Sequence, residues 1–180
     1  MNICVFCGSS AGANEQYADA AKTLGVCLAR SKSKLIYGGA KIGLMGILAD
    51  EVLAHQGTVV GVIPDFLMQR EVGHPALSEL IVVSSMHERK KKMADLADAF
   101  IAMPGGWGTL DELAEILTWK QLGLVHQPIG ILNTNSFFDM LYQQMVQMAN
   151  QGFLDKRQLA DVKISENPAK LLTLLGVKSQ

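Results

Sequence analysis

Short runs of apolar residues alternate along the chain with longer segments in which apolar residues recur every three or four positions. The short runs are typical of buried strands, and the longer segments are typical of helices that pack on a sheet. The pattern predicts strands at residues 3–6, 34–37, 58–63, 80–84, 99–103, 129–133 and 162–165. It predicts helices at residues 15–30, 43–55, 65–70, 86–97, 113–119, 137–151 and 168–175, with an irregular segment at 71–79.

This alternation predicts an α/β fold, because strands that are separated by helices pair as a parallel sheet covered on both faces. We expect one Rossmann-like domain over residues 1–180, with a doubly wound parallel sheet of about six to seven strands. In such folds ligands bind beyond the carboxyl ends of the strands. Glycine-rich or polar clusters follow the predicted strands in this chain, which favours a single nucleotide-sized pocket at that edge of the sheet.

The most informative cluster is the segment Pro104–Glu112, which joins the predicted strand 99–103 to the predicted helix 113–119. Free backbone N–H groups and the helix dipole favour an anion there, and glycines let a phosphate approach the backbone closely. Glu112, expected in the first turn of the helix, would then lie beside the phosphate ester. A tight turn explains an isolated Pro-Gly-Gly equally well, but three glycines in four residues followed by Thr109 and an acidic pair favour a binding site.

Four basic residues in a row, 89–92, lie near the start of the predicted helix 86–97. Cations at a helix N-terminus oppose the helix dipole, so we expect at least one of them to bind an anion. Arg89 is the best candidate, because a guanidinium grips phosphate through two parallel hydrogen bonds. Lys91 and Lys92 are expected to be solvated, and a solvated basic helix face is the alternative explanation for the whole run.

Two further loops are weaker signals. Residues 8–10, Gly-Ser-Ser, lack the G-x-G-x-x-G pattern of a dinucleotide site, and residues 38–43, GGAKIG, lack the G-x-x-x-x-G-K-[ST] pattern of a P-loop. A simple turn explains either loop as well as a binding role does.

Cys4 and Cys7 form a C-x-x-C, but residues three apart on a strand face opposite sides and no second pair completes a zinc site. We therefore expect small buried cysteines and no metal site.

Composition narrows the classes of partner. The 180 residues carry a formal net charge of −1, which gives no electrostatic reason to expect nucleic acid as a partner. No stretch approaches the roughly 20 apolar residues that span a membrane, and the N-terminus enters a strand without a signal-peptide pattern. Three cysteines, an odd number, argue against a disulfide framework. A cytoplasmic protein without a membrane partner is the resulting expectation.

With these segments the chain resembles the LOG ("lonely guy") family of cytokinin riboside 5'-monophosphate phosphoribohydrolases, which overlaps with proteins labelled possible lysine decarboxylases. The resemblance covers nearly the whole chain. It rests on two paired signatures, an M-x-x-R-K at residues 86–90 and a PGGxGTxxE at residues 104–112, both without departure at a motif position.

The resemblance implies hydrolysis of the N-glycosidic bond of an adenine-type nucleoside 5'-monophosphate, either AMP or an N6-modified cytokinin nucleotide. The products would be the free base and ribose 5-phosphate, no cofactor is expected, and the chain would form a homodimer. Arg89 and Glu112 would be the catalytic pair. The remaining substrate-binding residues are expected to be Gly8, Ser9, Gly39, Glu71, Met86, Lys90, Gly105, Gly106, Trp107, Gly108, Thr109 and Thr118.

The residue types agree with that chemistry. Cleavage of an N-glycosidic bond develops positive charge on the ribose, which an ionised carboxylate stabilises while it takes a proton from the attacking water. A helix N-terminus would lower the pKa of Glu112, which favours a base or electrostatic role over an acid role. An arginine stays protonated, so we expect Arg89 to position the phosphate or ribose rather than to donate a proton. Bulk water or a ring nitrogen of the base remain as sources of the leaving group's proton.

Two other functions compete with hydrolysis. A non-catalytic nucleotide or cofactor carrier on the same fold would show the same binding loops, since fold does not fix function. The presence of both Arg89 and Glu112 favours the enzyme. A lysine decarboxylase would need a lysine placed for a pyridoxal phosphate Schiff base with an acidic partner, and the sequence offers no such arrangement.

Overall fold

The computed structural model describes residues 1–71 and 73–178. Its strands are β1 (Asn2–Phe6), β2 (Lys34–Tyr37), β3 (Val59–Pro64), β4 (Glu79–Val83), β5 (Ala99–Ala102), β6 (Ile129–Leu132) and β7 (Lys163–Ser165). Its helices are α1 (Glu15–Arg30), α2 (Gly43–Ala54), α3 (Asp65–Glu71), α4 (Met86–Leu96), α5 (Trp107–Gln121), α6 (Asp139–Asn150), α7 (Lys156–Asp161) and α8 (Pro168–Leu174), with a 3-10 turn η1 at Thr134–Ser136.

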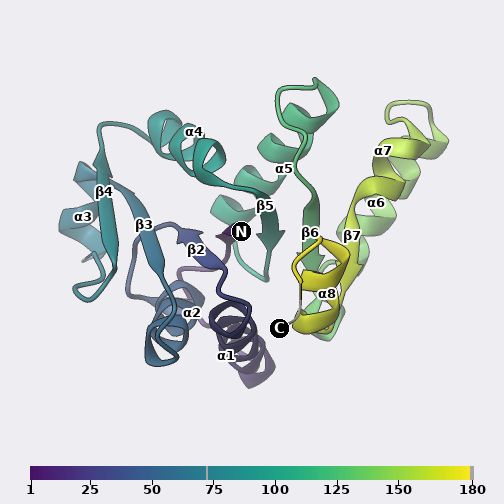
Figure 1. The fold of residues 1–180 in the computed structure, drawn as a ribbon. Helices are drawn as coiled ribbons and strands as arrows, with labels where there is room; N and C mark the ends of the chain where they lie inside the picture. Colours follow the sequence, from purple (N-terminus) through teal and green to yellow (C-terminus); the bar gives the residue numbers. More distant parts are fainter. Residues whose placement is uncertain (72, 179–180) are drawn as a thin grey trace.

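The seven strands form one sheet in the order β4-β3-β2-β1-β5-β6-β7, and all of its strand pairs are parallel (Figure 1). The chain starts at the centre, moves outward to β4, and returns beside β1 to build the other half. This reversal confirms the predicted doubly wound α/β fold. The loops after β1 and β5 diverge at the reversal point, where such sheets bind ligands.

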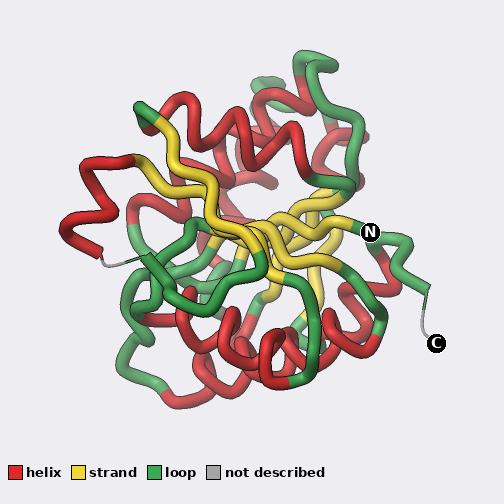
Figure 2. The backbone as a smooth tube through the Cα atoms, turned by 60° about the vertical axis from the view of Figure 1, so that its left-hand side comes forward, coloured by secondary structure: helices red, strands yellow, loops and turns green. Residues whose placement is uncertain are grey.

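Helices cover both faces of the sheet, as Figure 2 shows with the strands lying between two layers of helix. One apolar core lies under α1, α2 and α8, and a second lies under α4 and α5. Strand residues alternate between these cores because successive side chains point to opposite faces. Cys4 belongs to one core and Cys7 to the other, which confirms that this C-x-x-C is two separate buried thiols.

The largest departure from the sequence prediction is the start of α5. The helix begins at Trp107 rather than Leu113, with Gly106 in an extended conformation as its N-cap. Glycine is a poor helix former, so the sequence indicated a loop where Gly108 and Thr109 are already helical. The prediction that Glu112 lies in the first turn is therefore wrong, because that residue lies in the second turn.

Two short elements were not predicted, η1 and α7. The helix α7 has six residues, too few to display a helical period, and its start is marked by Asp155, whose side chain caps Arg157 N.

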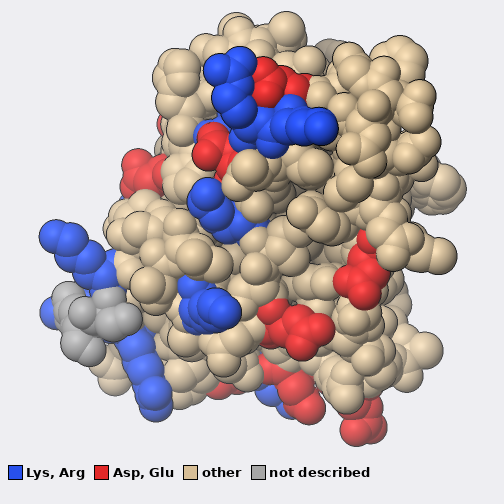
Figure 3. All heavy atoms as spheres, turned by 90° about the vertical axis from the view of Figure 1, so that its right-hand side faces the viewer, with Lys and Arg blue, Asp and Glu red and all other residues tan. Residues whose placement is uncertain are grey.

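No helix in the described residues is long and apolar enough to cross a membrane. Figure 3 shows acidic and basic side chains together at the top of the face in view, basic ones toward the left and acidic ones toward the lower right.

Candidate active site

A cavity of about 240 Å³ opens at the reversal point of the sheet, beyond the carboxyl ends of β1, β2 and β5. The helices α4 and α5 contribute its charged side chains. It is lined by Val5, Cys7, Gly8, Ser9, Gly38, Met45, Leu67, Met86, Arg89, Gly106, Trp107, Gly108, Thr109 and Glu112.

Glycines let three loops meet beneath this cavity. Gly8 N donates to the Pro104 carbonyl at 3.1 Å, and the Gly8 carbonyl accepts from Leu44 N at 3.0 Å, so the loop after β1 connects β5 to α2. A Cβ at Gly105 would collide with the Thr109 hydroxyl and lie 2.9 Å from Gly8 N. Gly105 is therefore needed for this close packing, and it supports the cavity without lining it.

The N-terminus of α5 faces the cavity with its backbone exposed. Its N-cap, Gly106, has no side chain to accept from the first N–H groups, which lack partners within the helix. A Cβ added at Gly106 or Gly108 would meet no atom within 4 Å, so open space adjoins the backbone there. Free N–H groups, open space and the positive end of a helix dipole together form a site suited to phosphate.

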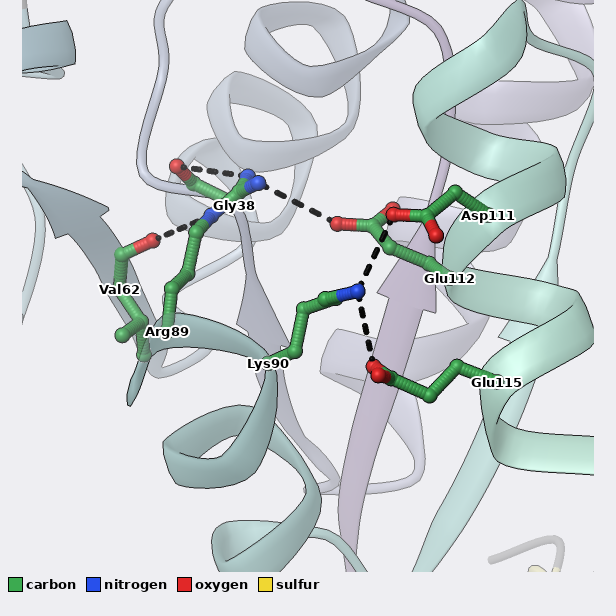
Figure 4. A network of polar contacts seen from close by, with 7 residues as sticks. All are labelled: Gly38, Val62, Arg89, Lys90, Asp111, Glu112 and Glu115. Atoms are coloured by element: carbon green, nitrogen blue, oxygen red, sulfur yellow. Dashed lines mark hydrogen bonds and ion pairs between the residues drawn. The ribbon is translucent and has the colours of Figure 1, made fainter. Parts of the chain in front are cut away.

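Arg89 projects from α4 across the end of the sheet and is 7% exposed. Its Nε donates to the Val62 carbonyl at 3.1 Å, its Nη2 donates to the Gly38 carbonyl at 3.4 Å, and its Nη1 lies 3.3 Å from Glu112 Oε1 (Figure 4). A Cβ at Gly38 would overlap Nη2, so only glycine lets the guanidinium occupy this position. Each terminal nitrogen keeps one further N–H for a ligand.

Glu112 is the acidic partner of Arg89 and is 9% exposed. Burial raises the pKa of Glu112 from 4.5 to about 7, although the Arg89 charge acts in the opposite direction. The prediction that the helix N-terminus lowers this pKa is therefore wrong. Glu112 lies beyond the first turn, where the dipole effect fades, and removal from water has the larger effect.

The raised pKa also makes Glu112 costly for folding. The folded state holds this proton more tightly than the unfolded state, so the charged form is destabilising above pH 4.5 and fully so above pH 7. A pKa rise from 4.5 to about 7 corresponds to roughly 3 kcal/mol. We expect Glu112→Gln to raise the free energy of unfolding at about pH 8 by up to that amount, and to leave it unchanged at about pH 4.

Urea denaturation of both proteins at the two pH values measures this effect. Glu166→Gln is the matched control, because Glu166 is exposed and distant from the cavity lining. A Glu112→Gln variant that is less stable than the unaltered protein at about pH 8 would show that burial does not penalise the carboxylate.

The cavity brings together most of the residues that the sequence singled out. The predicted residues that line it are Gly8, Ser9, Met86, Arg89, Gly106, Trp107, Gly108, Thr109 and Glu112. Lys91 and Lys92 are exposed, as predicted. The side chain of Glu71 lies outside the described part of the chain.

Four other predicted residues do not line the cavity. Gly105 lies beneath it, and Gly39 packs against Ile63 and Leu80 with a positive φ of 79°. The side chain of Lys90 forms ion pairs with Asp111 and Glu115 on α5. Thr118 follows Thr109 by nine residues, about 14 Å along the helix, and lines a different cavity.

Five residues of the lining were missed from the sequence: Val5, Cys7, Gly38, Met45 and Leu67. The sequence did point toward Gly38, because two glycines, 38 and 39, follow the second strand and either of them can face the cavity. The others are apolar residues that the sequence could not distinguish from core. Burial raises the pKa of the Cys7 thiol, so it stays uncharged at neutral pH.

A larger apolar groove, of about 650 Å³, lies between α5, α6 and α7. Its lining includes Leu117, Met145 and Leu159, and the charged pair Arg89–Glu112 lies outside it. Size alone would favour this groove, and Lys120 and Asp161 in its lining pair with each other at 3.6 Å. The buried ion pair Arg89–Glu112 lies in the smaller cavity instead, and bond cleavage needs ionisable groups that converge on the reacting atoms. We therefore identify the smaller cavity as the candidate active site.

Comparison with known proteins gives a family match. A family model described as "possible lysine decarboxylase" matches residues 45–175. The chain is 42% identical over 173 residues to a cytokinin riboside 5'-monophosphate phosphoribohydrolase of Arabidopsis thaliana, covering 96% of this chain and 81% of the relative. It is 47% identical over 154 residues to the protein of that name from Rhodococcoides fascians, covering 85% of this chain and 78% of the relative.

Solved structures share the fold at lower identity. A molybdenum cofactor binding protein from Rippkaea orientalis superposes with a TM-score of 0.73 at 22% identity, covering 97% of this chain and 94% of that one. A Moco carrier protein from Chlamydomonas reinhardtii gives 0.71 at 21% identity, covering 97% of both chains. These likenesses support the Rossmann-like architecture.

Proposed function

This chain belongs to the possible lysine decarboxylase family, and it is similar in sequence to cytokinin riboside 5'-monophosphate phosphoribohydrolases. From that premise we propose that it is a hydrolytic N-glycosidase. The substrate is an adenine-type nucleoside 5'-monophosphate, either AMP or an N6-modified cytokinin nucleotide. The products are the free base and ribose 5-phosphate.

One observation carries the proposal: the buried pair Arg89–Glu112 and the uncapped N-terminus of α5 share a single cavity. The N–H groups of Gly106, Trp107 and Gly108 suit the 5'-phosphate. A phosphate bound there brings the ribose within reach of Glu112 and Arg89, which we propose as the catalytic pair. Gly8, Ser9 and Met86 complete the walls.

In the proposed reaction, the bond between ribose C1' and the base nitrogen breaks, and its electron pair leaves with the base. The oxygen of a water molecule bonds to C1', and Glu112 takes the proton that this water loses. The base gains one proton, so water adds H to the base and OH to the ribose. Ionised Glu112 also stabilises positive charge on the ribose, while Arg89 keeps the carboxylate in place.

This role requires the carboxylate form, so activity should follow the ionisation of Glu112. Because the pKa of Glu112 is about 7, we expect kcat/KM to be half-maximal near pH 7 and to fall about tenfold per pH unit below it. Initial rates across a pH series measure this profile. A rate that instead falls above pH 7 would identify Glu112 as a proton donor.

The decisive experiment incubates the purified protein with AMP and, separately, with isopentenyladenosine 5'-monophosphate, and follows released base by chromatography. The matching nucleosides and triphosphates are the controls. Release from monophosphates alone supports the proposal, and the ratio of the two rates identifies the preferred base. Release from none of them contradicts it.

A carrier function is the second candidate, favoured by the fold shared with a molybdenum cofactor binding protein and a Moco carrier protein. Tight binding of a monophosphate in calorimetry without release of base would support it. The buried Arg89–Glu112 pair favours the enzyme, because binding alone gives no reason to bury a carboxylate that lowers the free energy of unfolding.

We also propose that the chain is a homodimer. The apolar groove between α5 and α6 and the exposed side chains of Leu122, Leu124 and Met140 support a protein partner. Light scattering of the purified protein tests this: a particle of twice the chain mass is expected, and a monomer at micromolar concentration would contradict it.

A further inference from the structure

Lys90 follows Arg89 in the sequence but makes contacts with different residues. Successive helical residues point about 100° apart, so the two side chains leave α4 in different directions. Lys90 Nζ lies 3.2 Å from Asp111 Oδ2 and 3.1 Å from Glu115 Oε2, both on α5. In Figure 4, Arg89 reaches Glu112 while Lys90 lies between the other two carboxylates.

Asp111 and Glu115 place negative charge on either side of Glu112 along one helix. Like charges this close disfavour each other's ionisation, and each of the two raises the pKa of Glu112. Lys90 acts in the opposite direction and lowers it. The side chain of Lys90 is only 11% exposed, so its charge is shielded from solvent more than that of Asp111, which is 60% exposed.

Apolar side chains make up the rest of the lining between Lys90, Glu112 and Glu115, and the space is partly open to solvent. Phe6, Ala94, Ile116 and Trp119 line a gap of about 10 Å³, room for about one water molecule. Lys90 makes no hydrogen bond to Glu112 among the described contacts, and its charge acts on Glu112 across this gap.

The remaining titratable groups that face Glu112 in the described structure are Arg89 and the thiols of Cys4 and Cys7 on the β1 side. Burial raises the pKa of both thiols, so they carry no charge near neutral pH. Burial has the largest effect on the pKa of Glu112, and the charges that modify it are two cations from α4 and two anions from α5.

We propose that Lys90 is a positioning residue that binds Asp111 and Glu115, offsets their charge, and so favours the ionised form of Glu112 that the reaction needs. This inference rests on the proposed hydrolase function. The family resemblance implied that Lys90 binds the substrate. The inference instead assigns Lys90 to the support of the catalytic carboxylate.

The test replaces Lys90 with methionine, which keeps the length of the stem and removes the charge. We expect the half-maximal point of kcat/KM to move upward by about one pH unit, so that activity falls about tenfold at about pH 6 and little at about pH 9. Lys91→Met is the matched control, because Lys91 is exposed and pairs with Asp95 outside the cavity. The control should leave the profile unchanged.

A rescue variant separates this role from simple packing. In Lys90→Met/Glu115→Gln one anion is removed together with the cation, so the half-maximal point should return toward its original pH. Lys90→Arg, which keeps the charge, should leave it near that pH. A lower melting temperature with an unmoved profile would show that Lys90 is merely structural, and an unmoved profile with a raised KM would place it on the substrate.

A second readout does not depend on activity. Carbon-13 labelling of glutamate side chains lets NMR follow the ionisation of Glu112, identified by the signal that Glu112→Gln lacks. Its titration should move upward in Lys90→Met, and an unmoved titration overturns the inference. If no nucleotide is hydrolysed by the unaltered protein, the proposed function fails while this titration still decides the role of Lys90.

Discussion

Replacing Glu112 with glutamine is expected to lower the rate of base release by about 100-fold to 10,000-fold, the usual range for loss of a positioned acid–base group. Glutamine fills the same volume, so Gly106, Trp107 and the rest of the proposed phosphate site keep their places. It cannot accept a proton from water or carry negative charge beside the ribose. The substitution therefore removes the chemistry and leaves binding in place.

Two measurements separate these effects for Glu112→Gln. Single-turnover release of base from AMP gives the loss in rate, and calorimetry with ribose 5-phosphate, the proposed product, gives the affinity of the phosphate site. We expect the affinity to change by less than about threefold, since no phosphate contact is lost. Glu166→Gln should behave as the unaltered protein, and full turnover in Glu112→Gln would remove this residue from the mechanism.

Replacing Arg89 with lysine is expected to lower base release by about 100-fold, although the positive charge is kept. The guanidinium spans three partners at once: the Val62 carbonyl, the Gly38 carbonyl and Glu112. A single ammonium nitrogen cannot reach all three, so Glu112 loses its fixed orientation. At least one buried carbonyl also loses its donor, which costs about 1–3 kcal/mol of stability.

Steady-state kinetics and thermal unfolding test the Arg89→Lys variant together. Arg157→Lys makes the same chemical change at a side chain that is 91% exposed and pairs only with its neighbour Asp155 among the described contacts, so it serves as the control. Unaltered kinetics in Arg89→Lys would show that charge alone is needed at this position. A rate loss that disappears at higher substrate concentration would assign Arg89 to binding.

The strands and most of the helices were predictable because each buried strand is a short apolar run and each helix shows its own period. The prediction of α1 at residues 15–30 agrees with the structure, and β2 at residues 34–37 does too. The start of α5 was not predictable, because glycine at 106 and 108 gives the same signal in a loop and in a first helical turn that binds a ligand.

The electrostatics of the site were not predictable in the same way. The pKa of Glu112 depends on how much water the fold removes, which is set by β1, α4 and the sheet rather than by neighbours in sequence. The partners of Lys90 depend on how α4 and α5 pack against each other. Local pattern indicated most of the residues that line the cavity, and tertiary packing determined what each one contacts.

All of the described residues that line the cavity lie between Val5 and Glu112, although the chain continues through β6, β7 and α8. Laboratory evolution of this protein therefore divides into two separate problems. A library aimed at a new base needs only apolar positions of the wall such as Met45, Leu67 and Met86. A library aimed at heat tolerance can be confined to residues 122–178, and gains from the two should combine additively where the chosen positions do not touch.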